Sequence, residues 1–139
     1  MGKTVQSTTV NATADKVWAT VRDFHDMSWA TSIVTECKPV GDKRGDQVGA
    51  KRVLNDAFHE TLLEVSEIDH SIRYSIDNGP VPVGDADEYI GLLRVFPVTD
   101  SNTSYVEWSS NWHGKDAETA EFCSPLYVAM LSDLKKKFA

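Results

Sequence analysis

Apolar and polar residues alternate along most of the chain between Val48 and Trp112, and an alternation with period two predicts β-strands. The expected strands are Val48 to Leu54, Phe58 to Ile68, Ser71 to Ile76, Tyr89 to Val98 and Ser104 to His113. In the last strand, one set of side chains should face water and the alternate set should face inward. These are Glu107, Ser109 and Asn111 on the outside against Trp108, Ser110 and Trp112 on the inside.

The pattern changes to helical spacing from about Ala117 to Phe138. The apolar residues of this segment are Phe122, Leu126, Met130 and Leu134, with Tyr127, Leu131 and Phe138 beside them. Pro125 either follows a fresh start capped by Ser124 or kinks the helix. A curved antiparallel sheet followed by one long covering helix predicts a protein built around an internal pocket.

The segment before Val48 predicts a strand from Lys3 to Val10 and a helix from Ala14 to Val21 with Asn11 or Thr13 as its N-cap. Next come a second short helix within Phe24 to Ile33 and a strand from Val34 to Val40.

A three-residue loop, Asn55-Asp56-Ala57, predicts that the two strands flanking it form a hairpin. If the loop is symmetric, Leu54 faces Phe58, Arg52 faces Glu60 and Ala50 faces Leu62. All three pairs then share one face of the sheet, so an ion pair is expected among apolar neighbours on the concave side. The Gly- and Pro-containing segment from Asp77 to Asp87 should be a loop over the pocket mouth.

Composition narrows the possible functions. The 139 residues are expected to form a single domain, 1–139, and carry a net charge of −7, which disfavours nucleic acid as a partner. No apolar run reaches the length of a membrane span and the N-terminus lacks a signal-peptide pattern, so we expect no membrane insertion and a cytoplasmic protein. Cys37 and Cys123 are expected to be free thiols.

Six short motifs occur in order along the chain: V-x-A-x-x-x-x-V-W (10–18), D-F-x-x-M-x-W (23–29), V-G-A-x-R (48–52), H-E-T-L (59–62), Y-S-I-x-x-G-P-x-P-V (74–83) and Y-x-x-x-L-x-V-x-P (89–97). Together with the terminal helix, they resemble the polyketide cyclase/dehydrase branch of the START-like helix-grip (SRPBCC) superfamily, which also contains the plant abscisic acid receptors. The resemblance implies an α+β fold. A curved seven-stranded antiparallel sheet would wrap around the long C-terminal helix, with two short helices after the first strand.

The resemblance also implies an apolar pocket for a small hydrophobic or amphipathic molecule. Carried over by position, its lining would be Arg52, Phe58, Glu60, Tyr89, Ser110, Phe122, Leu126 and Met130. The loop from Gly79 to Asp87 would close over the ligand. Two departures argue against a hormone-receptor role: the loop at 55–57 is shorter than the receptors' gating loop, and Thr31 lies near the position of their ligand-anchoring lysine.

The charged pair has two possible roles. Arg52 and Glu60 would anchor a polar ligand group or transfer a proton, or they would be a structural ion pair that stiffens the hairpin. Tyr89 would either donate to a ligand or simply pack, and packing is the better expectation. His25, His59, His70 and His113 lack metal-ligand spacing, and no cofactor motif is present, so neither a metal nor an organic cofactor is expected.

Two functions remain open from the sequence. The favoured one is a carrier or sensor that binds a small apolar or amphipathic molecule in the cavity. The alternative is a cyclase, dehydratase or isomerase that uses Arg52 and Glu60, with Tyr89 assisting. An interaction module that uses the outer sheet face is a third class. The ligand's identity and the oligomeric state cannot be read from the residues.

Overall fold

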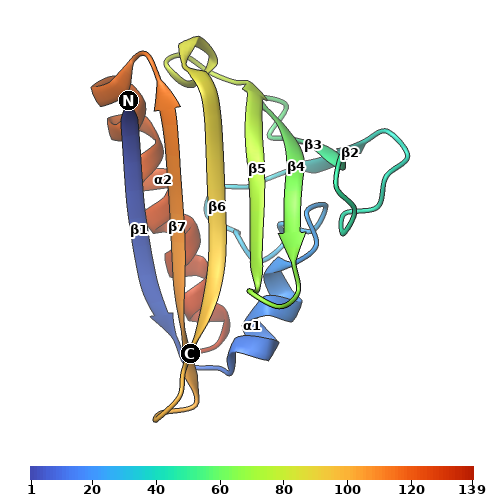
Figure 1. Cartoon of the computed structure of the whole chain (residues 1–139), viewed down its shortest axis with the longest axis vertical. Coiled ribbons are helices and arrows are strands. Elements are labelled where there is room, and N and C mark those ends of the chain that lie inside the picture. Colours follow the sequence, from blue (N-terminus) through green and yellow to red (C-terminus); the bar gives the residue numbers. More distant parts are fainter.

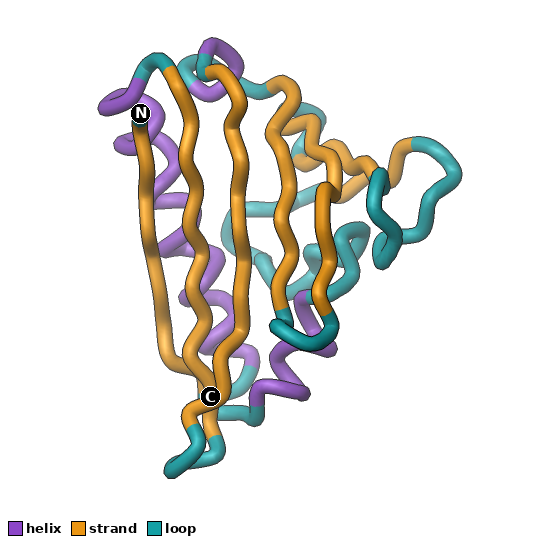
Figure 2. Tube along the Cα trace, in the orientation of Figure 1, coloured by secondary structure: helices purple, strands orange, loops and turns teal.

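The computed structural model describes all residues from 1 to 139 and contains one seven-stranded antiparallel sheet. Its strands are β1 (Gly2–Val10), β2 (Cys37–Val40), β3 (Lys51–Leu54), β4 (Phe58–Ser66), β5 (Ser71–Asn78), β6 (Asp87–Val98) and β7 (Thr103–His113). They are arranged in the order β1-β7-β6-β5-β4-β3-β2, which Figures 1 and 2 show from the outer face. The expected α+β helix-grip fold is confirmed.

Both helices lie on the same side of this sheet, behind it in Figure 1. Thr13 is the N-cap of the helix α1 (Ala14–Val21), because its hydroxyl accepts a hydrogen bond from the Lys16 N–H. Of the two expected caps, Asn11 and Thr13, the second is the one used. The helix α2 (Asp116–Lys137) runs behind β1, β7 and β6. Neither helix combines the length and the apolar composition needed to cross a membrane.

The main apolar core lies between the concave face of the sheet and the two helices. A smaller cluster joins Val83, from the 3-10 turn η1 (Val83–Asp85), to Tyr89, Trp112 and Cys123. The loop after β5 therefore packs over this second cluster. None of the loop residues from Gly79 to Ala86 lines the cavity described below.

The predicted register of the β3–β4 hairpin is confirmed. Leu54 pairs with Phe58 and Arg52 pairs with Glu60. The alternation in β7 is confirmed as well, because Trp108, Ser110 and Trp112 are all buried.

The expected second short helix between Phe24 and Ile33 is not present, and this stretch is a series of turns. The side chains of Asp23 and Asp26 accept hydrogen bonds from the backbone N–H groups of His25 and Ser28. Such local bonds compete with the helical pattern, which explains why the segment does not continue as a helix.

The strand expected from Val34 begins only at Cys37. The Asn55 side-chain oxygen accepts the backbone N–H groups of Thr35 and Glu36 at 2.8 and 3.2 Å, so neither amide is free to join a ladder there. The Asn55 side chain of the hairpin loop, and not a neighbouring strand, is the hydrogen-bond partner of the backbone at Thr35 and Glu36.

The helix α2 continues through Pro125 without a fresh start at Ser124. Proline deprives the Glu121 carbonyl of its helical partner, but Glu121 and Pro125 are both exposed, so water can satisfy that carbonyl. The Ser124 hydroxyl does not act as a cap and instead bonds the Thr4 hydroxyl of β1 at 2.7 Å.

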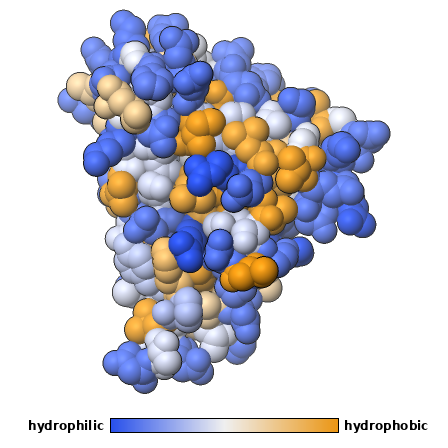
Figure 3. Space-filling model, viewed as in Figure 1, coloured by the Kyte–Doolittle hydropathy of each residue, from blue (hydrophilic) through white to orange (hydrophobic).

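The outer face of the sheet carries apolar residues over β4 to β6 that are interrupted by strongly hydrophilic ones (Figure 3). The half-buried outward positions of β6 illustrate this mixture, since Ile90 and Leu92 are followed by Arg94. Leu63 of β4 is exposed on the same sheet.

Candidate functional site

A cavity lies between the concave face of the sheet and α2, and apolar side chains form most of its wall. Its lining comes from strands β3 to β7, the loop between β3 and β4, α2 and the turn segment before β2. It consists of Met27, Ile33, Val34, Arg52, Leu54, Asn55, Phe58, Glu60, Tyr74, Ile76, Tyr89, Trp108, Cys123, Leu126, Tyr127 and Met130. The cavity has a volume of about 40 Å³. That holds at most a few water molecules, whereas pockets for drug-sized ligands measure roughly 300–1,000 Å³.

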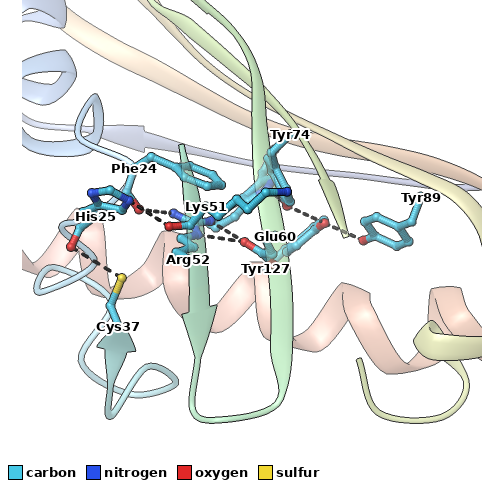
Figure 4. Close-up of polar contacts among 10 residues, drawn as sticks. Phe24, His25, Cys37, Lys51, Arg52, Glu60, Tyr74, Tyr89 and Tyr127 are labelled. Carbon is cyan, nitrogen blue, oxygen red and sulfur yellow. Dashed lines mark hydrogen bonds and ion pairs between the residues drawn. The ribbon is translucent and has the colours of Figure 1, made fainter. Parts of the chain in front are cut away.

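An ion pair between Arg52 of β3 and Glu60 of β4 lies in this wall (Figure 4). The Arg52 Nε and Nη2 atoms lie 2.8 and 2.6 Å from the same carboxylate oxygen, Oε1. The side chains are only 2% and 5% exposed, so water does not screen the attraction. The pairing follows from the hairpin register, which places both residues directly opposite each other on the inner face.

The turn segment holds the guanidinium from its other side. The Arg52 Nη1 donates to the Phe24 carbonyl oxygen at 2.9 Å, and the guanidinium carbon lies 3.8 Å from the centre of the Phe24 ring. This arrangement adds a cation–π contact to the ion pair. Burial raises the pKa of the Glu60 carboxyl, and the neighbouring Arg52 charge opposes that rise.

A chain of hydroxyl groups crosses the wall beside the ion pair (Figure 4). The hydroxyl of Tyr127, from α2, lies 3.0 Å from that of Tyr74 and 2.5 Å from that of Tyr89. The Trp108 indole N–H donates to Tyr74 at 2.9 Å, and the Ser110 hydroxyl lies 2.8 Å from that of Tyr89. Because the indole can only donate, the Tyr74 oxygen accepts there and its own proton is free to continue the chain toward Tyr127.

These phenols remain neutral over the physiological pH range. Burial is the main cause that raises the pKa of Tyr74, Tyr89 and Tyr127 above the usual value. The chain can therefore donate and accept hydrogen bonds without adding charge to the cavity.

Two side chains hold the segment that forms one edge of the cavity. Asn55 binds the Thr35 and Glu36 amides, as described above, and its Nδ2 donates to the Ile33 carbonyl at 2.7 Å. From α2, Asp133 accepts both the N–H and the hydroxyl of Ser32, at 2.9 and 2.6 Å. Ile33 and Val34 thus reach the cavity from a segment without regular secondary structure that is held at both ends.

The residues expected to line the pocket divide into two groups. Those that line the cavity are Arg52, Phe58, Glu60, Tyr89, Leu126 and Met130. The other two do not line it. Ser110 lies behind Tyr89, to which it is hydrogen-bonded, and the Phe122 ring packs 6.3 Å from the ring of Phe58.

Sequence reasoning missed the hydroxyl chain, although part of its signal was present. Tyr74 pairs with Leu62, which was expected on the inner face, so extending the register to the next strand would have placed Tyr74 inside. The contribution of Phe24 and Asn55 left no such signal, because it depends on the path of an irregular segment.

The structure contains no cluster of three or more His, Cys, Asp or Glu side chains arranged to hold a metal ion. Both cysteines are free. The polar side chains in the cavity wall are those of the ion pair, the hydroxyl chain with the Trp108 indole, and Asn55.

Comparisons with known proteins agree with this architecture. The family model described as polyketide cyclase / dehydrase and lipid transport matches residues 1–139. A solved structure of a protein from Nitrosospira multiformis is 42% identical over 99% of this chain and 96% of its own, with a TM-score of 0.96.

More distant solved structures share the fold. The protein XoxI from Bacillus cereus is 24% identical with a TM-score of 0.80, over 99% of this chain and 96% of its own. A protein from Thermobifida fusca is 23% identical with a TM-score of 0.86, over 99% and 93%. No curated protein matches the sequence significantly. The match over the whole length, on a helix-grip fold with an inner cavity, shows that the chain belongs to the polyketide cyclase / dehydrase and lipid transport family.

Proposed function

We propose that the protein binds a small hydrophobic or amphipathic molecule in the cavity between the sheet and α2, as a carrier or a sensor. The observation that carries this proposal is the buried Arg52–Glu60 pair in the wall of an otherwise apolar cavity. Replacing a buried ion pair by well-packed apolar residues is often neutral or stabilising, so fold stability alone gives little reason to keep one there. A polar ligand group supplies that reason, and the family's association with lipid transport supports it.

Binding requires the cavity to widen, because about 40 Å³ accommodates no ligand of the expected class. The part best suited to move is the segment around Ile33 and Val34, which contributes cavity wall without belonging to a helix or strand. Side-chain bonds from Asn55 and Asp133 hold it, and these can break without disrupting the sheet.

The neutral fluorescent probe N-phenyl-1-naphthylamine tests this proposal, because its emission rises in apolar surroundings. We expect saturable one-to-one binding to the purified protein. Leu126→Trp enlarges a half-buried residue of the cavity wall and should weaken binding at least tenfold. Val128→Trp introduces the same large side chain at an exposed position of the same helix and should leave binding unchanged. Equal binding by all three proteins, or no saturation, would refute the proposal.

The second candidate is an enzyme of cyclase, dehydratase or isomerase type, favoured by the raised pKa of the Glu60 carboxyl beside a chain of neutral phenols. A buried carboxyl in this state can exchange a proton with a substrate as a general acid or base. Glu60→Gln separates the two functions. A binder changes its affinity and has no turnover to lose, whereas an enzyme keeps binding substrate and loses its rate.

A further inference from the structure

All three guanidinium nitrogens of Arg52 already have partners within the chain. Nε and Nη2 bind Glu60 Oε1, and Nη1 binds the Phe24 carbonyl. The Phe24 ring also lies against the guanidinium, which still forms part of the cavity wall. Its charge is matched by one buried carboxylate, so the pair brings no net charge to the cavity.

The carboxylate of Glu60 is used on one side only. Oε1 receives both nitrogens of Arg52, while Oε2 has no hydrogen-bond partner in the chain. This oxygen is not completely sealed from solvent, and Glu60 lines the cavity. A carboxylate oxygen is a strong acceptor, and here it has room for a donor from the cavity side.

The neighbouring hydroxyl groups do not need a ligand in the same way. Tyr74, Tyr127, Tyr89 and Ser110 bond one another, and none of their oxygens is sealed without a partner. The unpartnered acceptor of Glu60 is therefore the polar feature of the wall that a ligand can complete.

Charge limits which ligands can do so. A ligand carboxylate would enter an apolar cavity next to the like charge of Glu60, and the Arg52 cation beside it is already matched by that carboxylate, so the cavity has no uncompensated positive charge to offset the lost hydration. An ammonium ligand would leave two cations around one carboxylate in the same low-dielectric space. An alcohol, a phenol or a neutral N–H group loses little on desolvation and can donate to Oε2.

We infer that the cavity selects an uncharged ligand with a hydrogen-bond donor, which Glu60 Oε2 accepts, and that it rejects carboxylates such as fatty acids. This inference rests on the proposed function. It names the chemical class of the ligand and gives Glu60 the role of the residue that determines specificity.

Matched competitors test the inference at pH 7, with 2-naphthol and 2-naphthoate displacing N-phenyl-1-naphthylamine from the purified protein. The two share one ring system and differ in a neutral donor against a carboxylate. We expect naphthol to compete at concentrations at least tenfold lower than naphthoate. Naphthoate that competes as well as naphthol, or naphthol that fails to compete although the probe binds, would overturn the inference and leave the proposed function standing. If the probe itself does not bind, the proposed function fails, and the inference with it.

Removing the negative charge of Glu60 gives the reverse test. In Glu60→Gln, Arg52 loses its counter-charge and can receive an anion, so the preference for naphthol should shrink at least tenfold or reverse. Glu64→Gln removes an exposed carboxylate from the same strand and should keep the wild-type preference. If Glu60→Gln does not fold, the comparison in the wild-type protein still decides.

Discussion

The phenol ring of Tyr74 lies directly over Gly91, its partner on the neighbouring strand. A Cβ atom at residue 91 would come within 2.2 Å of the Tyr74 Cζ atom and 2.5 Å of its hydroxyl oxygen, far inside contact distance. The missing side chain at Gly91 is therefore what allows the Tyr74 hydroxyl to reach Tyr127 and Trp108. A residue outside the cavity wall thus positions one within it.

Gly91→Ala should destabilise the protein by about 1–3 kcal/mol, the usual cost of overpacking a tight interior. Urea unfolding measures the change. If the clash with Tyr74 is the cause, the same substitution should cost clearly less in a Tyr74→Leu background, where the ring is gone. An equal cost in both backgrounds would show that the phenol has no part in it.

Removing one partner of the buried Arg52–Glu60 ion pair should lower the stability of the protein strongly. Removing both charges should lower it much less. Arg52→Met leaves the Glu60 carboxylate unpaired and should lower the free energy of unfolding by about 3–5 kcal/mol, whereas adding Glu60→Leu should recover most of that loss. Urea unfolding of both variants checks the difference.

A surface ion pair provides the control for that experiment. Arg94 and Asp69 lie 3.9 Å apart with side chains 40% and 60% exposed, so Asp69→Asn should cost no more than about 1 kcal/mol. The account of the buried pair is wrong if Arg52→Met costs no more than this control.

The Asn55 side chain should protect the amides at the edge of the cavity from hydrogen exchange. Asn55 has a positive φ of 55°, which glycine adopts without strain, so Asn55→Gly removes the side-chain bonds and keeps the backbone. We expect the Thr35 and Glu36 amides to exchange about three- to tenfold faster, corresponding to the loss of a hydrogen bond worth roughly 0.5–1.5 kcal/mol.

Asn102 serves as the matched position because it has a φ of 54° and its side chain makes no hydrogen bond. Asn102→Gly should leave exchange at Thr35 and Glu36 unchanged. Unaltered protection in Asn55→Gly would mean that the segment is held by other contacts.

The turn that contains Asp26 and Ser28 should make a pH-dependent contribution to the free energy of unfolding. Hydrogen bonds from the Ser28 hydroxyl and N–H lower the pKa of Asp26 below its ordinary value of 3.8. A lowered pKa in the folded state stabilises the protein above the unfolded value, and this contribution is lost as pH falls through the folded value. Ser28→Ala should therefore be less stable than the wild type at pH 6, and the difference should shrink toward pH 2.

Urea unfolding at several pH values measures that difference. Ser109→Ala removes a hydroxyl from the outer sheet face, where it makes no side-chain hydrogen bond, and its effect should not change with pH. A gap between wild type and Ser28→Ala that stays constant down to pH 2 would contradict the assignment to Asp26.

The sequence predicts those features of the structure that depend on residues close together in the chain. The pairing of Arg52 with Glu60 follows from a three-residue loop and the period of a strand, and both are visible in the sequence. Two of the α2 residues that line the cavity, Leu126 and Met130, follow from helical spacing in the same way.

Features that depend on side chains from distant segments could not be predicted in this way. The region from Phe24 to Ile33 has apolar residues that fit a helix, yet bonds from Asp23 and Asp26 to nearby amides turn the chain instead. The contact between Tyr74 and Tyr127 requires the register of three strands and the rotation of α2 together, and no single pattern contains this information.

The central claim is that a small molecule binds inside the molecule, between the sheet and α2. The most direct test is an NMR measurement of intermolecular NOEs between bound N-phenyl-1-naphthylamine and the methyl groups of the protein. The account predicts NOEs from the aromatic protons of the probe to Leu126 and Met130, both in the cavity wall. NOEs to Leu63 and Leu92 on the outer sheet face, with none to the cavity residues, would contradict it.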